Sequence, residues 1–266
     1  TMLDVVSRFK QSYKKVHLEL EIGEADQLRD MLTAVRPHFR FAYQNKKLKY
    51  FNVSAAFDIE TTSFYEGEDK RGCMYVWQLG IYGAVMEGRT WEEFVSVIND
   101  LSKILDLNEN KRFIIYVHNL NYEFQWMRHW FTWFKVFSLE HRRPVYAITD
   151  NFIEFRCSYI LSGYGLSKVS EHLNNYPVKK LTGELNYRQI RHAGTPLTDA
   201  ELAYCVNDVK VVMAYIQEEI DMRGYITRLP LTKTGNVRTF CREKCFIDPE
   251  DPKDRRKKRK YHEMME

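Results

Sequence analysis

The sequence lacks any apolar run that approaches the ~18–20 residues of a membrane-spanning helix, and no segment has the pattern of a secretory signal. Paired cysteines are missing as well. The five in the chain do not form the double pair typical of zinc sites, and an odd number argues against a disulfide framework. We therefore expect reduced thiols in a cytoplasmic protein that makes no membrane contact. The cysteines are Cys73, Cys157, Cys205, Cys241 and Cys245.

A large excess of positive charge is also lacking, since the net charge of the 266 residues is only +4. Residues 250–266 contain seven Lys/Arg and five Asp/Glu, so +2 of this total belongs to that stretch and +2 to residues 1–249. Proteins that bind duplex nucleic acid are usually far more basic. A narrow channel for a single strand remains compatible with this charge, because base stacking and bound metal ions can supply much of the binding.

Apolar residues are abundant, with 44% hydrophobic and 14% aromatic residues, enough for a sizeable core. Residues 1–50 are loosely patterned and form an N-terminal appendage, with a short amphipathic helix predicted from Glu24 to Val35. Residues 51–222 carry the main domain. Residues 223–266 end in a charged stretch with almost no aliphatic residues, for which we predict a mobile tail. Its basic run, Arg255–Lys260, suits either a solvated tail or an electrostatic contact with DNA.

Strand and helix patterns alternate through the main domain. The predicted strands cover residues 50–57, one or two strands within 74–86, 113–117, and a hairpin over 145–159 with its turn near 149–151. The predicted helices cover residues 90–105, 120–134, 166–173 and 198–222, and capping boxes at Thr90–Glu93 and Thr198–Glu201 open the first and the last. Alternating strands and helices predict an α/β sheet with helices packed on it.

Asp58-Ile59-Glu60 follows the first predicted strand of this domain. Because side chains at i and i+2 of a strand lie on the same side, both carboxylates project together while Ile59 enters the core. Two buried acids side by side repel each other, and one would be forced to bind a proton. Divalent cations relieve that repulsion, and oxygen ligands suit Mg²⁺ or Mn²⁺. Taken alone, the pair is a weak signal, because it is also typical of the end of an ordinary surface strand.

Two further acids lie on predicted helices. Tyr204 and Asp208 are four residues apart, so a phenol and a carboxylate share one helix face, where the phenol can orient a metal-bound water. Glu123 lies just inside the helix that follows the strand ending at His118, and Asn119 precedes that helix. Each has a structural alternative, because an acid favours a helix N-terminus and Asn is a common N-cap.

In this order and spacing, the three segments resemble the three motifs of the DEDD superfamily of 3′→5′ exonucleases. The matches are Asp58-x-Glu60, Asn119-x-x-Tyr122-Glu123 and Tyr204-x-x-x-Asp208. The stretch before the third motif is similar to that of protein-primed family-B DNA polymerases of bacteriophages and plasmids. It matches at Leu181, Gly183, Tyr187, Thr198, Glu201, Tyr204 and Asp208. The resemblance covers residues 51–222, the predicted exonuclease domain.

This resemblance implies a ribonuclease-H-like fold, a mixed sheet flanked by helices, and a proofreading reaction that removes 3′-terminal nucleotides from single-stranded DNA with two Mg²⁺ or Mn²⁺ ions. Carried over by position, the metal ligands are Asp58, Glu60, Glu123 and Asp208, and Tyr204 completes the catalytic set. The implied contacts to the strand are Thr61, Asn119, Tyr122, Ser158 and Tyr159. The resemblance also implies a terminal priming protein as a partner, and the cytoplasm of the host cell as the location of a viral member.

The chain departs from the family pattern at two positions. Glu123 stands where the second motif usually has Asp, which keeps a carboxylate but adds one methylene. Thr182 stands where family members commonly have Lys, and Lys179 or Lys180 is the candidate substitute.

Polymerase catalytic motifs are absent from these 266 residues, although residues 229–238 resemble the entry into the polymerase half. Residues 223–266 are therefore expected to be the start of that half, or a linker with the basic tail. Cys241-x₃-Cys245 with His262 has poor spacing for a metal site. Two alternatives remain open: an exonuclease of the same superfamily that acts on RNA, and a non-catalytic module that binds single strands or a priming protein.

Overall fold

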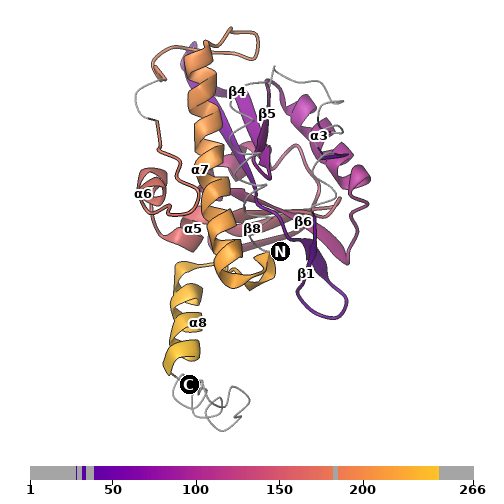
Figure 1. Cartoon of the computed structure of the whole chain (residues 1–266). Coiled ribbons are helices and arrows are strands. Elements are labelled where there is room, and N and C mark those ends of the chain that lie inside the picture. The colour runs from indigo at the N-terminus through magenta and orange to yellow at the C-terminus, as the bar shows by residue number, and fades with distance from the viewer. Residues whose placement is uncertain (1–27, 29–31, 34–38, 182–184, 246–266) are drawn as a thin grey trace.

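The computed structural model describes Leu28 and residues 32–33, 39–181 and 185–245 (Figure 1). Leu28 and Leu32 are helical and buried in the main core, so the predicted helix from Glu24 to Val35 lies only partly within this range. The rest of the N-terminal appendage before Phe39 and the basic tail lie outside it. None of the helices formed by the described residues is long and apolar enough to span a membrane.

The described residues build a nine-stranded mixed sheet in the order β5-β4-β3-β6-β9-β8-β7, with the β1–β2 pair attached to β6. Its centre is parallel, because β3 and β9 both run in the direction of β6, whereas β4, β5, β8 and β7 pair antiparallel. The strands are β1 (Phe41–Tyr43), β2 (Lys49–Phe51), β3 (Ala55–Glu66), β4 (Asp69–Ile81), β5 (Ala84–Gly88), β6 (Lys111–Val117), β7 (Trp133–Glu140), β8 (Arg143–Thr149) and β9 (Ile153–Cys157).

The helices are α3 (Trp91–Ile104), α4 (Leu120–Met127), α5 (Ser158–Ser162), α6 (Leu166–Glu171), α7 (Asp199–Arg223), the 3₁₀ turn η2 (Ile226–Arg228) and α8 (Lys233–Cys245). Both predicted capping boxes form, Thr90 with Glu93 at the start of α3 and Thr198 with Glu201 at the start of α7. Side-chain oxygens satisfy amides that the first helical turn leaves without partners, so the two helices begin where the sequence predicts.

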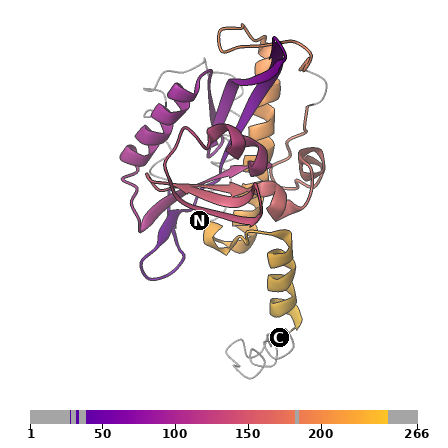
Figure 2. The same cartoon turned by 180° about the vertical axis from the view of Figure 1, so that it is seen from behind.

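Helices α3 and α7 pack on opposite faces of the sheet (Figures 1 and 2). On the α3 face, Phe94 stacks on Phe57 of β3 with ring centroids 4.2 Å apart. On the other face, α7 approaches the strands so closely that a Cβ at Gly80 of β4 would lie 2.6 Å from Val209 and from Met213. The mixed sheet with helices on both faces confirms the predicted α/β, ribonuclease-H-like fold.

The single strand predicted over residues 50–57 is wrong. The chain forms β2 and β3 instead, because between them the side chain of Asn52 turns away to bond the carbonyl of Gly224 at 3.4 Å and the amide of Ile226 at 2.8 Å. Asp58 also lies within β3 rather than at a strand end. Pairing with β4 continues to Glu66, after a bulge that follows Glu60.

The helix predicted over residues 120–134 is too long. Helix α4 ends at Met127, and the chain enters β7 at Trp133. Aromatic and β-branched residues in this stretch suit a strand as well as a helix, and pairing with β8 decides in favour of the strand. The predicted hairpin over residues 145–159 does form from β8 and β9, although Ser158 and Tyr159 begin helix α5 instead of ending the second strand.

Candidate active site

Strand β3 directs the first-motif acids toward α7. Ala56 pairs with Gly80, which lies against α7, and alternate side chains of a strand share a face, so Asp58 and Glu60 project on the α7 side. Phe57 and Ile59 point into the core on the α3 side. Asp58 is partly buried and Glu60 is buried.

Helix α7 contributes the third motif to the same place. Tyr204 and Asp208 lie one turn apart on this helix, and both are buried where it packs on β3. The charge of Asp208 raises the pKa values of both Asp58 and Glu60, which places the three carboxyls near one another. The hydroxyl of Tyr204 lies 3.3 Å from that of Tyr187.

Lys180 neutralises Asp208. Its Nζ donates to both carboxylate oxygens, at 2.6 and 2.7 Å, and lies 5.0 Å from the centroid of the Tyr204 ring. Asn207 fixes the backbone on either side of the lysine, because its side chain accepts from the Leu181 amide at 3.0 Å and donates to the Lys179 carbonyl at 3.1 Å. Of the two candidate substitutes for the missing family lysine, Lys180 is thus the one that reaches the acids, while Lys179 is exposed.

Glu123 completes the group of acids from the first turn of α4, where it is buried. Its carboxyl is hydrogen-bonded to that of Asp58. Its other oxygen, Oε2, is buried and has no hydrogen-bond partner within the described part of the chain. Burial and the neighbouring Asp58 charge raise the pKa of Glu123 well above its ordinary value. The longer side chain therefore still brings its carboxyl to the first-motif acids.

Burial favours protonation throughout this carboxyl cluster, which we define as Asp58, Glu60, Glu123 and Asp208, and neighbouring carboxyl charges add to the effect at the first three. The pKa of Asp58 is raised to about 7, chiefly by burial and then by the Asp208 charge. The pKa of Glu60 is raised to about 8, chiefly by burial and then by the Asp58 and Asp208 charges. Burial also raises the pKa of Asp208, although Lys180 opposes the shift. Such clustered and perturbed acids mark a functional site more often than a structural one.

The donor set of the carboxyl cluster fits hard divalent cations, which prefer carboxylate oxygens. The buried, unpartnered Oε2 of Glu123 also offers an unused ligand atom. In the described residues, however, no three His, Cys, Asp or Glu side chains are already arranged to hold one metal ion together. Both oxygens of Asp208 accept hydrogen bonds from Lys180 instead.

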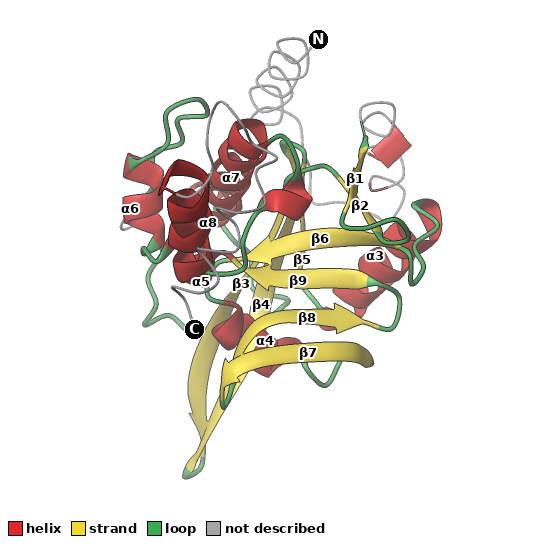
Figure 3. Cartoon of the chain, turned by 90° about the horizontal axis from the view of Figure 1, so that it is seen from below, coloured by secondary structure: helices red, strands yellow, loops and turns green. Residues whose placement is uncertain are grey.

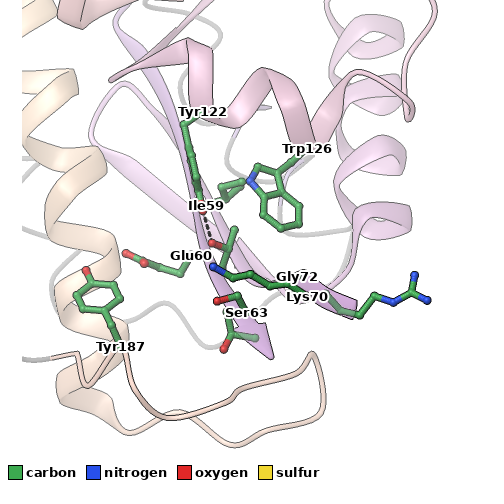
Figure 4. Close-up of a pocket in the computed structure, with 11 residues that line it drawn as sticks. Ile59, Glu60, Ser63, Lys70, Gly72, Tyr122, Trp126 and Tyr187 are labelled. Carbon is green, nitrogen blue, oxygen red and sulfur yellow. Dashed lines mark hydrogen bonds between the residues drawn. The ribbon is translucent and has the colours of Figure 1, made fainter. Parts of the chain in front are cut away.

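A cleft of about 680 Å³ opens beside Glu60, between the β3–β4 hairpin and α4 (Figure 4). Tyr122 and Trp126 extend into it from α4, and Tyr187 lines the opposite side. Lys70 and Arg71 add positive charge from β4. An aromatic cleft with two basic side chains, lined at one side by Glu60 of the carboxyl cluster, suits an unpaired nucleic acid strand.

Neither a protein-family model nor a curated protein sequence matches this chain. Solved structures do match. Phi29 DNA polymerase in complex with single-stranded DNA superposes with a TM-score of 0.53 at 16% identity, over 71% of this chain and 34% of that chain. The same polymerase with primer-template DNA gives 0.49 at 16% identity, over the same shares of the two chains. The chain has the fold of one part of Phi29 DNA polymerase.

Phi29 DNA polymerase is a protein-primed family-B enzyme, and the matched part is consistent with its exonuclease domain. This likeness confirms the fold that the resemblance in sequence implies. The present chain spans about a third of the length of Phi29 DNA polymerase. At 16% identity the likeness establishes the fold, and each chemical role has to be argued from the side chains of this protein.

The predicted strand-contact residues fall into two groups, one at the cleft and the start of α4 and one at the start of α5. Only Thr61 and Tyr122 line the cleft, whereas Asn119, Ser158 and Tyr159 do not. Tyr122 is exposed at its wall and shares a short hydrogen bond with Thr61 (Figure 4). Asn119 is exposed, has a left-handed backbone with φ of 79°, and makes no capping hydrogen bond among the described residues. Its side-chain amide is therefore available to a ligand, and Asn119 does not act as a side-chain N-cap of α4.

The second group lies at the start of α5. Tyr159 is exposed and lies edge-on to the ring of His118, with centroids 5.7 Å apart. Ser158 is fully buried, and its hydroxyl bonds His118 Nδ1 at 3.0 Å and the Val117 carbonyl at 3.4 Å. In this arrangement Ser158 orients His118, so a strand contact of its own stays a prediction.

Sequence reasoning missed Trp126, Lys70 and Arg71 as lining residues of the cleft. Trp126 is four residues after Tyr122, and this helical spacing is a signal that could have suggested a shared face. The basic pair gave no signal, because it enters the cleft only through the unexpected extension of the β3–β4 hairpin. Gly72 permits the close approach of that hairpin to α4, since a Cβ there would lie 2.8 Å from the Trp126 ring.

Proposed function

We propose that this chain is a two-metal 3′→5′ exonuclease that removes 3′-terminal nucleotides from single-stranded DNA. One observation carries the proposal: acids from three separate motifs lie together beside an aromatic cleft, and neighbouring carboxyl charges add to the burial that raises the pKa values of Asp58, Glu60 and Glu123. Because the chain spans about a third of a polymerase that was solved with DNA, we propose that it is the proofreading part of a protein-primed family-B DNA polymerase.

The carboxyl cluster, Asp58, Glu60, Glu123 and Asp208, would hold two Mg²⁺ or Mn²⁺ ions. When bound, such ions would supply a lowered pKa for the attacking water and a positive charge beside the leaving oxygen. Binding requires that the carboxyls lose their shared protons and that Lys180 release Asp208. Lys180 then stands free beside the site as a cation that can meet the phosphate of the strand.

The remaining residues position the strand and the water. Tyr204 is buried between Lys180 and the Tyr187 hydroxyl, so its own hydroxyl has a fixed place from which to orient the water. Tyr122 offers a ring face for an unpaired base, and its bond to Thr61 fixes that ring. Fixed geometry of this kind lowers the entropic part of the barrier.

The reaction is hydrolysis of the terminal phosphodiester. Water attacks the phosphorus of the last nucleotide, and the bond to the 3′-oxygen of the preceding nucleotide breaks. That oxygen leaves with a proton as a new 3′-hydroxyl, and a deoxynucleoside monophosphate departs. Repetition shortens the strand one nucleotide at a time, which in a complete polymerase removes mismatched termini.

The closed arrangement of the carboxyl cluster favours one alternative, a non-catalytic module that binds single strands or a terminal priming protein. In that case the Lys180–Asp208 pair would be permanent, because the acids would have no cation to bind. The motifs also do not distinguish deoxyribose from ribose, so RNA is an alternative substrate. A viral origin and a location in the cytoplasm of the host cell follow from the proposed polymerase and are part of this proposal.

One experiment separates these functions. The protein is incubated with Mn²⁺ and an oligodeoxynucleotide labelled on its last nucleotide, and then with an all-ribose strand of the same sequence. Release of labelled deoxynucleoside monophosphate supports the proposal. Faster release from the ribose strand would indicate that RNA is the substrate. Binding of either strand without release would favour the non-catalytic module.

A further inference from the structure

A second hollow, of about 520 Å³, lies between the β1–β2 hairpin and the turn that follows α7. It contains none of the residues of the carboxyl cluster or of the cleft beside Glu60. Its lining is aromatic and polar: Phe41, Tyr43, Gln44, Tyr225, Thr227 and Arg228. Figure 3 shows the β1–β2 hairpin at the opposite end of the molecule from the tip of the β3–β4 hairpin, which borders the cleft.

Hydrogen bonds hold the two walls of this hollow together. Asn52, at the base of the hairpin, bonds the backbone of both Gly224 and Ile226. From the other wall, the Thr227 hydroxyl donates to the Tyr43 carbonyl at 3.4 Å. The hollow is therefore a feature of the packed fold, and it needs no rearrangement before a ligand enters.

The side chains of the hollow combine ring faces with cations. Tyr43 is 63% exposed and Tyr225 is 46% exposed, unusually open positions for two neighbouring aromatic residues. The guanidinium of Arg228 lies 5.0 Å from the centroid of the Tyr225 ring, and Lys49 lies 4.2 Å from that of Phe41. Nucleobases stack on such rings and phosphates pair with such cations.

The charge beside the hollow is positive. Residues 39–52, which form the β1–β2 hairpin, contain four Lys/Arg and no Asp or Glu, and Arg228 lines the hollow from the other wall. A local excess of positive charge favours contact with an anionic polymer.

We propose that this hollow is a second binding site for single-stranded nucleic acid, separate from the carboxyl cluster. A base stacks on Tyr43 or Tyr225, and the adjoining phosphates meet Arg228 and the lysines of the β1–β2 hairpin. The ligand class rests on the proposed function, but the site does not depend on catalysis. An acidic protein segment would match the charge without using the two exposed rings, so we favour the nucleic acid.

The test measures binding in EDTA, so that no strand is hydrolysed. Fluorescence anisotropy follows a labelled 20-nucleotide single strand with wild type, with a Tyr43→Ala, Tyr225→Ala double variant, and with Arg228→Glu. The matched controls are Phe134→Ala, an exposed aromatic on β7, and Lys103→Glu, an exposed cation on α3. Both rings of the double variant are largely outside the core, so folding is expected to persist, and circular dichroism checks it.

The double variant should weaken binding of the strand about tenfold, because removal of a stacking ring has an effect of this order. Arg228→Glu should lower the salt slope by ~0.7 for each phosphate that the protein no longer neutralises, while both controls leave affinity and slope unchanged. Hydrolysis of a four-nucleotide strand by the double variant should match wild type, with a raised KM only for long strands.

Unchanged affinity in both site variants would overturn the inference. If, in addition, an acidic peptide displaced the strand from wild type and the controls but not from the site variants, the hollow would bind an acidic protein segment instead. A protein that binds through the hollow but hydrolyses nothing would contradict the proposed function alone. A protein that hydrolyses the short strand but binds the long strand equally well in all variants would contradict this inference alone.

Discussion

Lys180 donates from Nζ to both carboxylate oxygens of Asp208, at 2.6 and 2.7 Å, and thereby occupies the acid that α7 contributes to the carboxyl cluster. The ammonium neutralises the charge of Asp208. The lysine and the metal ions are therefore expected to compete for the oxygens of Asp208. When a metal ion displaces Lys180, the ammonium group becomes available to the phosphate of the strand.

Lys180→Met should strengthen Mn²⁺ binding and yet lower the rate of hydrolysis about 10²-fold, the usual effect of losing one charge-stabilising donor. The two effects have opposite signs because the ammonium competes with the metal for Asp208 but stabilises the negative charge of the phosphate during hydrolysis. Isothermal titration and a strand-hydrolysis assay measure them separately. Lys179→Met is the matched control, since Lys179 is exposed, and it should behave as wild type. Equal losses of activity in both variants would show that Lys180 has no specific role in the site.

Glu123 is expected to work as a substitute for the usual aspartate. Glu123→Asp should keep the hydrolysis rate within about tenfold of wild type, a barrier change of ~1.4 kcal/mol, because a carboxylate remains. Glu123→Gln should abolish most of the activity, since the amide cannot supply a negative ligand. Rates measured on one labelled strand decide the matter, and a fully active Gln variant would show that charge at this position is irrelevant to metal binding.

Glu87 gives the fold a pH dependence. Burial raises its pKa from 4.5 to about 7, although Arg89 and Lys210 oppose the shift. The folded state thus binds a proton that the unfolded chain has released, so this group destabilises the fold progressively as pH rises from about 4.5 to about 7. Glu87→Gln should gain stability relative to wild type over that range and level off above it. Thermal melts in EDTA at several pH values test this, and a constant difference would refute the assignment.

Gln78 is a source of instability. It lies opposite Asp58 on one side and Glu87 on the other, and neither amide atom finds a partner among the described residues. A buried unpaired amide costs about 1–3 kcal/mol, so Gln78→Met should raise the melting temperature by several degrees. Gln217→Met is the comparison: its Oε1 is also unpaired among the described residues, but its Nε2 donates to Asp221 at 2.9 Å, so this substitution should stabilise less than Gln78→Met. A lowered melting temperature for Gln78→Met would mean that this amide has a stabilising partner.

The sequence was sufficient for those parts of the site that depend on local spacing. Asp58 and Glu60 share a face because a strand alternates, and Tyr204 and Asp208 share one because a helix turns every 3.6 residues. The starts of α3 and α7 were likewise predictable, since each depends on two side chains three residues apart.

Contacts set by distant partners were not predictable. Lys180 reaches Asp208 because Asn207, 27 residues later, fixes the backbone around it, and no local pattern reports that bond. The first two residues of strand β7, Trp133 and Phe134, fall within the predicted helix because aromatic residues suit either structure, and only pairing with β8 distinguishes the two; the rest of β7 is not predicted. The break after β2 has the same origin, since Asn52 bonds residues more than 170 positions away.

The central claim is that the carboxyl cluster hydrolyses DNA from a free 3′ end. Its most direct test compares a 5′-labelled linear single strand with a circular strand of the same sequence, both with Mn²⁺. Wild type should shorten the linear strand by single nucleotides and leave the circle intact. An Asp58→Ala, Glu60→Ala double variant that retains the fold should leave both strands intact. Cleavage of the circle, or undiminished shortening by the folded double variant, would contradict the account.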